Sequence, residues 1–258
     1  MKTKTYLADV IGNAGDKAQF DEHAKRIIAD KGVLSWIIKY TVEELKDYSL
    51  EITYDIRFYV LLPKGERIKL ILNVEVQKDF YPGYDLVTRA VFYCTRMISA
   101  QLNTEFNDSN YDDLKKVYSI WICPNASRKE TDTITEYHIE PRMLYGSSEI
   151  RHRYDLMSVV MVGLNAESWR VKETPLHGFL GTIFSKELKE AEKLKILERD
   201  YEVKITRELK EGISRMCNLS DAIEERGIQQ GIQQGEEIKL IELICRKVRK
   251  GKARLFRS

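Results

Sequence analysis

Long apolar runs and signal-like segments are missing from this sequence of 258 residues. The longest nearly uninterrupted apolar stretch, residues 156–164, has about half the length that a membrane-spanning helix requires. The first residues include two lysines but no apolar segment of signal-peptide length. We therefore expect a cytoplasmic protein with no membrane among its partners.

Cysteine and histidine are scarce and scattered. The four cysteines form no CxxC pair, and the four histidines do not cluster with them. This spacing excludes the common zinc-site motifs and predicts reduced thiols. The residues in question are Cys94, Cys123, Cys217 and Cys245, together with His23, His138, His152 and His177.

An excess of one charge is missing as well. The chain carries 42 basic and 40 acidic residues, which leaves a net charge of +2. A surface that is basic throughout is therefore excluded. Hydrophobic residues make up 43% of the chain, with 14 glycines and 5 prolines, which is a globular composition. The length permits one large domain, or one domain with an appendage.

The hydrophobic period changes along the chain. Three- and four-residue spacing over residues 19–45 predicts one or two helices, interrupted at Gly32, with Asp21 in the first turn or cap. Alternation over residues 54–62 and 67–77 predicts a β-hairpin. A helix is expected over residues 85–102, strands over 117–123 and 133–139, and a further strand or buried segment over 155–164. These elements predict an α/β domain, a layered sheet flanked by helices.

The hairpin brings two carboxylates together if its apolar and polar side chains lie on separate faces. Opposed residues share a face, so Asp55 must lie across from an odd-numbered residue. A loop of three or five residues centred on Gly65 places it opposite Glu75, and we prefer that register.

Asp55 and Glu75 then form the candidate site. Two carboxylates are suitable ligands for Mg²⁺, and the carbonyl of Val76 is a candidate third ligand. Gln77, on the same face, is placed to orient the attacking water or a phosphate oxygen. The alternative is an ordinary solvated hairpin face. Opposed like charges, however, destabilise a sheet unless a cation or Arg57 neutralises them.

The run YDIRFYVL…IKLILNVEVQKDFYPGYDLVTRAVFYCTRMIS resembles the recombination-promoting nuclease, or transposase-like, branch of the PD-(D/E)XK nuclease superfamily. The resemblance spans about residues 19–165 and is most specific over residues 54–99. It implies a restriction-endonuclease-like core that cuts DNA with Mg²⁺. In it Asp55 matches the motif aspartate and Glu75 the second acidic residue. Asp21, in FDEHAK, resembles the acidic position of the family's first helix, although Ala24 replaces the usual aromatic residue.

The sequence departs from the family pattern at Gln77, where lysine is usual. Glutamine can orient and hydrogen-bond but carries no charge, and Lys78 points to the opposite face if the strand continues. Arg89 and Tyr93 match positions on the following helix, where the resemblance implies contacts to the active site or to DNA phosphate. A packing or cation–π pair is the alternative for these two residues.

The composition shifts near Pro175. We expect a nuclease-like domain over residues 1–175 and a charged helical arm over residues 176–258. Gly227, Gly231 and Gly235 share one stripe of the arm, which favours either self-association into a homo-oligomer or a flexible arm. The last thirteen residues contain seven Lys or Arg and no acid, so the tail either contacts phosphates or is solvated, and the rest of the chain is net acidic.

Together with these features, the resemblance implies a Mg²⁺-dependent DNA endonuclease linked to recombination or mobile elements, with DNA as its partner. Two alternatives stay open. One is a catalytically inactive DNA-binding protein that retains the fold. The other is an interaction protein that oligomerises through its C-terminal helices.

Overall fold

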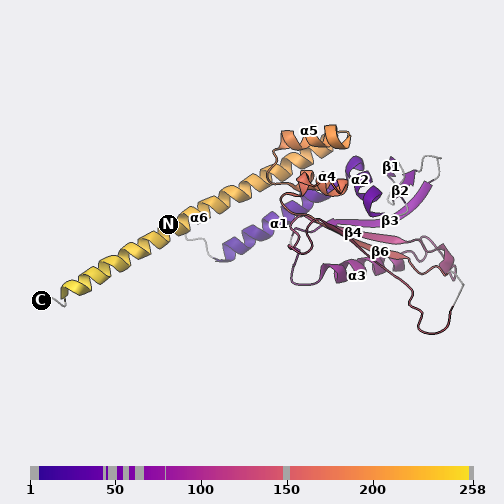
Figure 1. The fold of residues 1–258 in the computed structure, drawn as a ribbon, viewed down its shortest axis with the longest axis horizontal. Coiled ribbons are helices and arrows are strands. Elements are labelled where there is room, and N and C mark those ends of the chain that lie inside the picture. Colours follow the sequence, from indigo (N-terminus) through magenta and orange to yellow (C-terminus); the bar gives the residue numbers. More distant parts are fainter. Residues whose placement is uncertain are drawn as a thin grey trace. The chain divides into compact units, whose positions relative to one another are not determined.

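The computed structural model describes residues 6–42, 45, 51–54, 58–61, 67–78, 80–147 and 152–255 (Figure 1). The chain divides into two compact units, Met1–Met216 and Cys217–Ser258. All of the sheet and the candidate site belong to the first unit, and the second consists of the greater part of one long helix.

Two helices begin the first unit, α1 (Tyr6–Ile28) and α2 (Lys31–Thr41). Asp30 caps α2, because its Oδ1 atom accepts hydrogen bonds from the backbone N–H groups of Gly32 (2.9 Å) and Val33 (3.3 Å). The break therefore lies at Asp30, and Gly32 is already inside the second helix. The predicted place of Asp21 in a first turn is wrong, since α1 begins at Tyr6.

A mixed sheet of six strands forms the centre of the first unit, in the order β1-β2-β3-β4-β6-β5. The chain first makes an antiparallel meander of β1 (Glu51–Tyr54), β2 (Phe58–Leu61) and β3 (Arg67–Val76). Strands β3, β4 (Val117–Cys123) and β6 (Met157–Gly163) are parallel, and β5 (Thr133–His138) closes the edge antiparallel to β6. The mixed α/β class predicted from the sequence is confirmed.

The register of the hairpin differs from the expectation. Tyr59 opposes Lys69 in the ladder of β2 and β3, whereas a loop centred on Gly65 would place it opposite Ile71. Odd-numbered residues do oppose odd-numbered residues, which confirms the separation of the two faces. A displacement by two residues leaves every side chain on its own face, so the hydrophobic pattern does not distinguish the two registers.

The single strand expected over residues 54–62 is two strands. Tyr54 ends β1 and pairs antiparallel with Phe58, the first residue of β2. Alternation with a period of two is the same in one long strand and in two short antiparallel strands, so the pattern does not reveal the reversal. Asp55 falls between these strands, outside the described residues.

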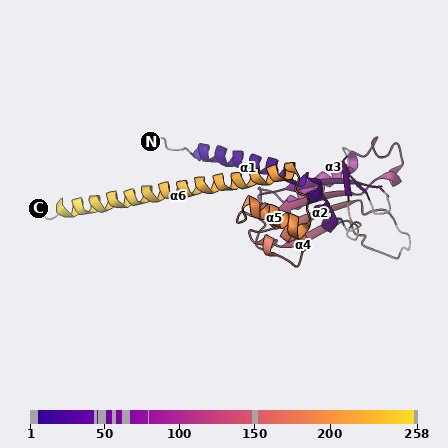
Figure 2. The ribbon, with the colours of Figure 1, turned by 90° about the horizontal axis from the view of Figure 1, so that it is seen from above.

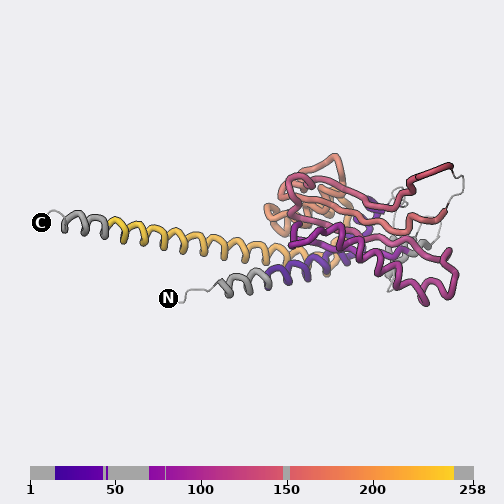
Figure 3. Tube along the Cα trace, turned by 90° about the horizontal axis from the view of Figure 1, so that it is seen from below, coloured from indigo at the N-terminus to yellow at the C-terminus, as the bar shows by residue number. Residues whose placement is uncertain are grey.

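Helices cover both faces of the sheet. Helix α3 (Leu86–Ser99) contacts β4 and β6 on one face (Figures 1 and 3). On the other side α1 contacts β3, while α2 contacts β1 and α4 (Pro175–Phe184). The buried cluster under α3 contains Leu86, Ala90, Cys94, Val117, Trp121, Cys123, Val159 and Met161. All seven residues of β4 are buried, as expected for a central parallel strand.

The compact first unit continues past the boundary expected near Pro175. Pro175 is the first residue of α4, and Leu176, Phe179 and Ile183 of this helix are fully buried, so it belongs to the core. Helix α5 (Glu190–Tyr201) follows and packs on α4 (Figure 2). The long helix α6 (Arg207–Leu255) belongs to the first unit only as far as Met216.

The cysteines form no disulfide in the structure, in agreement with their spacing. Burial raises the pKa of the Cys94 thiol to about 11 and that of Cys123 to about 12, so both remain protonated at neutral pH. They act as core side chains. None of the helices in the described ranges combines the length and apolar character needed to cross a bilayer.

Gly163 lies at the end of β6, and its substitution by alanine tests the packing at the carboxyl ends of the strands. A Cβ atom there would clash with the backbone carbonyl of Glu130. We expect Gly163→Ala to lower the free energy of unfolding by about 1–3 kcal/mol in urea titrations. Gly227→Ala is the matched control, because no atom lies near its would-be Cβ and alanine favours the helix. Equal effects of the two substitutions would contradict the packing.

Candidate active site

The parallel ladder between β3 and β4 positions the acidic residue of the candidate site. Glu75 pairs with Trp121 and Val76 with Ile122, and the backbone N–H of Gln77 donates to the Ile122 carbonyl at 2.8 Å. Paired residues share a face of the sheet, so Glu75 lies on the face that α3 covers. Glu75 is half-buried, whereas Val76 is buried and points to the opposite face.

Arg89 of α3 is held in an aromatic cluster above this face. Its Nε and Nη2 atoms donate to the Tyr93 hydroxyl at 3.1 and 2.7 Å, and Nη1 donates to the Tyr84 hydroxyl at 2.7 Å. The guanidinium carbon lies 5.1 Å from the ring centroid of Trp121 and 5.2 Å from that of Tyr93. Arg89 therefore stacks on the strand neighbour of Glu75.

The guanidinium keeps hydrogen-bonding capacity for a ligand. Arginine has five N–H donors, and the contacts to Tyr84 and Tyr93 use three of them. Among the described residues no carboxylate forms an ion pair with Arg89 or a cation with Glu75. A cation–π environment keeps the charge of the guanidinium without neutralising it, which suits an anionic group such as phosphate.

A small cavity of about 340 Å³ extends this face between β3 and α3. Asn73, on the same face of β3 as Glu75, lines it, and the buried Nδ2 atom of Asn73 has no hydrogen-bond partner among the described residues. Tyr93 lines the same cavity, so the cavity adjoins the Arg89 cluster. A buried donor of this kind can bind a ligand or a water as its acceptor.

Asp21 and Asp55 are the other acidic residues proposed from the sequence. Asp21 is half-buried on α1, one residue after Phe20, whose ring lies 5.5 Å from the Nζ atom of Lys78. This contact brings α1 to the end of β3. Asp55 lies outside the described residues, and the ladder of β2 and β3 does not have the register that placed it opposite Glu75, so a position beside Glu75 stays a prediction.

The described residues supply part of a magnesium site. Among them no three His, Cys, Asp or Glu side chains gather as a metal site requires. The Glu75 carboxylate and the Gln77 side-chain oxygen are hard donors of the kind that Mg²⁺ prefers. They fall short of a full ligand set on their own, so the fit of the metal depends on Asp55.

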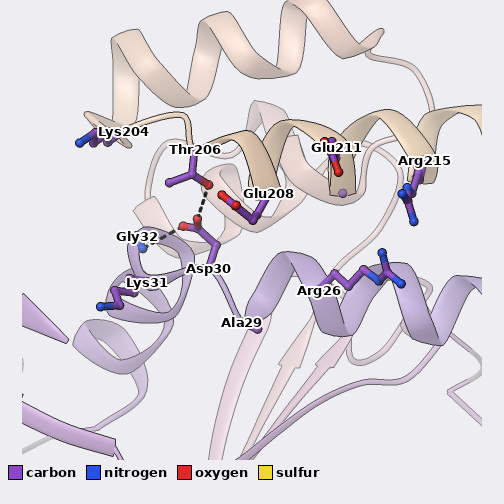
Figure 4. A pocket seen from close by; sticks show the side chains of 11 residues that line it. Arg26, Ala29, Asp30, Lys31, Gly32, Lys204, Thr206, Glu208, Glu211 and Arg215 are labelled. Carbon is purple, nitrogen blue, oxygen red and sulfur yellow. Dashed lines mark hydrogen bonds between the residues drawn. The ribbon is translucent and has the colours of Figure 1, made fainter. Parts of the chain in front are cut away.

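A larger cavity of about 700 Å³ lies elsewhere in the first unit, between the junction of α1 and α2 and the start of α6 (Figure 4). Its polar residues serve the packing of these helices: Thr206 donates to the Asp30 carboxylate at 2.8 Å, Arg26 pairs with Glu22, and Glu211 pairs with Arg207. Because Asp30, Arg26 and Glu211 are engaged in these contacts, we assign the cavity no chemistry.

Two members of the Arg89 cluster, Trp121 and Tyr84, are not indicated by the sequence pattern, because Trp121 lies in a buried strand and Tyr84 in the loop before the helix. The feature of the sequence that could identify Tyr84 is its spacing. It lies five residues before Arg89, directly before Asp85, which caps the start of α3. No local signal pairs Trp121 with Glu75, because the pairing depends on the sheet.

Comparisons of the chain with models of protein families, with curated proteins and with solved structures find no match.

The Tyr93 hydroxyl is the principal anchor of Arg89, since it accepts two hydrogen bonds. We expect Tyr93→Phe to lower the free energy of unfolding by about 1–2 kcal/mol, because a charged donor loses its acceptor. Tyr84→Phe removes one bond at an exposed ring and is expected to have a smaller effect. Urea titration measures both. If Tyr84→Phe destabilises more than Tyr93→Phe, the assigned anchoring is incorrect.

Proposed function

We propose that the chain is a Mg²⁺-dependent endonuclease that hydrolyses phosphodiester bonds in DNA, in a process of recombination or of mobile elements. One observation carries the proposal: a carboxylate at the end of β3 lies on the same sheet face as a guanidinium that has no carboxylate partner among the described residues. Glu75 and Arg89 are linked through Trp121, which pairs with the first and stacks on the second.

Phosphodiester hydrolysis needs a ligand set for the metal and positive charge for the phosphate. Bound Mg²⁺ supplies an acidified water and offsets charge on the phosphate. In this proposal Asp55 and Glu75 hold the ion, with the Val76 carbonyl as a further candidate ligand. Arg89 has a planar fork of donors that matches two phosphate oxygens, which a lysine would not.

Gln77 stands where the resembling family usually has lysine. Its backbone N–H is already bonded to β4, so the start of its side chain is fixed at the end of the sheet. The amide can orient a water or a phosphate oxygen but cannot neutralise charge. Arg89 supplies a cation on the same face, and this compensates for the missing lysine in the proposed site.

The proposed roles predict the outcome of a plasmid-nicking assay. In Mg²⁺, Asp55→Asn and Glu75→Gln should each lower the nicking rate at least about 100-fold, since each removes a charged metal ligand while keeping its size. EDTA should abolish nicking by the wild type.

Glu224→Gln is the control, because this glutamate is exposed on α6 in the second unit. It should cut like the wild type. Retention of wild-type nicking by Glu75→Gln would show that the site is assigned to the wrong residues. If no variant cuts but all bind DNA, the chain is a DNA-binding protein without nuclease activity.

Self-association is a second proposed property, favoured by the surface of α6. Seven large aliphatic residues of this helix are between 47% and 60% exposed in the second unit: Ile228, Ile232, Ile238, Leu240, Ile241, Leu243 and Ile244. Apolar side chains gathered this densely mark interaction surfaces. A homo-oligomer formed through this helix would bury them.

Light scattering coupled to size-exclusion chromatography tests the association. The wild type should elute at a multiple of 30.1 kDa, and the double variant Ile241→Asp, Ile244→Asp at the monomer mass. Gln233→Asp, on the same helix but at a polar position, should keep the wild-type mass. A wild type that is monomeric at all concentrations would refute self-association.

A further inference from the structure

Two loops lie side by side at the carboxyl ends of the parallel strands. Residues 77, 78 and 80–85 follow β3, and residues 124–132 follow β4. Asn125 Nδ2 donates to the Lys78 carbonyl at 3.2 Å, and Phe80 and Ala126 both pack on the core cluster under α3. This edge of an open α/β sheet is where ligands usually bind.

The loop after β3 exposes two aromatic rings. Tyr81 is 73% exposed, with its ring edge-on to Phe80 at 4.8 Å, and Tyr84 is 49% exposed, with its hydroxyl bonded to Arg89. Both tyrosines are anchored through one edge or one atom. Each therefore presents an aromatic surface to solvent from the loop that follows β3.

Positive charge accompanies these rings. Arg128 and Lys129 are exposed in the loop after β4, and Lys78 and Arg89 border the loop after β3. Two nearby carboxylates already accept hydrogen bonds within the protein. Asp85 caps α3 by accepting from the backbone N–H groups of Val87 and Thr88, and Asp132 accepts from the side chains of Asn165 and Ser168. The combination of exposed aromatic rings and nearby cations is typical of surfaces that bind single-stranded nucleic acid.

We propose that this edge is a binding site for single-stranded DNA, in which Tyr81 and Tyr84 stack on bases while Lys78, Arg89, Arg128 and Lys129 contact phosphates. In a duplex each base is already stacked between its neighbours and offers no open face to a tyrosine. If the proposed nuclease function holds, on which this part of the inference rests, the DNA strand to be cut is unpaired, or frays, beside Glu75.

The opposite end of the strands supplies a matched control. Tyr111, in the short helix η2 (Tyr111–Asp113) that precedes β4, is 65% exposed, and its ring lies 5.4 Å from that of Phe106. Its exposure and its phenylalanine contact are similar to those of Tyr81. Asp112 and Asp113 follow it, while Lys115 is exposed nearby and Arg153 donates to the Asp112 carbonyl, so its surroundings carry both signs of charge.

Fluorescence anisotropy of the full-length protein tests the site, with EDTA present so that no strand is cut. The probe is one labelled oligonucleotide, used alone and annealed to its complement. We expect the wild type to bind the single strand more tightly than the duplex. Tyr81→Ala and Tyr84→Ala should each weaken single-strand binding by about 5- to 100-fold, with a smaller effect on the duplex. Tyr111→Ala should change neither.

Two further variants separate the components of the site. Tyr84→Phe keeps the ring but loses the hydroxyl bond to Arg89, so it should weaken single-strand binding less than Tyr84→Ala does. The double variant Arg128→Gln, Lys129→Gln should weaken binding of both probes and lower the dependence of affinity on salt, since fewer counterions are released. Thermal unfolding of each variant verifies that these exposed substitutions leave the fold intact.

The proposal is overturned if Tyr81→Ala and Tyr84→Ala bind the single strand like the wild type, or if Tyr111→Ala weakens it equally. The nicking assay keeps the two proposals separate. Loss of nicking in Glu75→Gln together with unchanged binding in the tyrosine variants refutes the stacking site alone. Tyrosine-dependent binding in a protein that does not nick DNA refutes the nuclease function and leaves the binding site standing.

Discussion

The parallel ladder between β3 and β4 is the constraint on which the rest of the candidate site depends. Strand β4 is buried along its whole length, so its backbone groups need partners on both sides, and β3 and β6 supply them. This pairing puts Glu75 beside Trp121 and fixes the face toward which each of them points. The bond from the Gln77 N–H to the Ile122 carbonyl extends the pairing to the end of the strand.

Helix α3 follows from that ladder in turn. Asp85 caps its start, and Leu86, Ala90 and Cys94 are buried against the sheet, which fixes the rotation of the helix about its axis. Arg89 is consequently brought over Trp121. Arg89 stacks on Trp121, which is the buried strand neighbour of Glu75. Neither the helix nor the strand specifies this arrangement by itself. It unites, on one sheet face, the acidic and basic groups that the proposed hydrolysis requires.

Cations lie near the carboxyl ends of the strands, where the loops expose Arg128 and Lys129 and hold the half-buried Lys78. The short helix before β4 exposes Asp112 and Asp113, but Lys115 and Arg153 are exposed beside it, so charge is mixed at that end. A ligand rich in phosphate is attracted to one edge of the sheet, and this edge is where Glu75 and Gln77 lie. The proposed hydrolysis and the proposed stacking of bases therefore concern a single surface.

The sequence by itself determined the mixed α/β class, the bounds of β4, the helix that begins at Asp85, and the separation of the two faces of β3, because each depends on hydrophobic period or capping within a short segment. Only the tertiary structure decided the register of β2 against β3, the continuation of the core through α4, and the placement of Trp121 and Tyr84 around Arg89. A register shift of two residues preserves the pattern of faces, and the cluster joins residues from a strand, a loop and a helix. Such contacts arise from packing between elements, which no local pattern encodes.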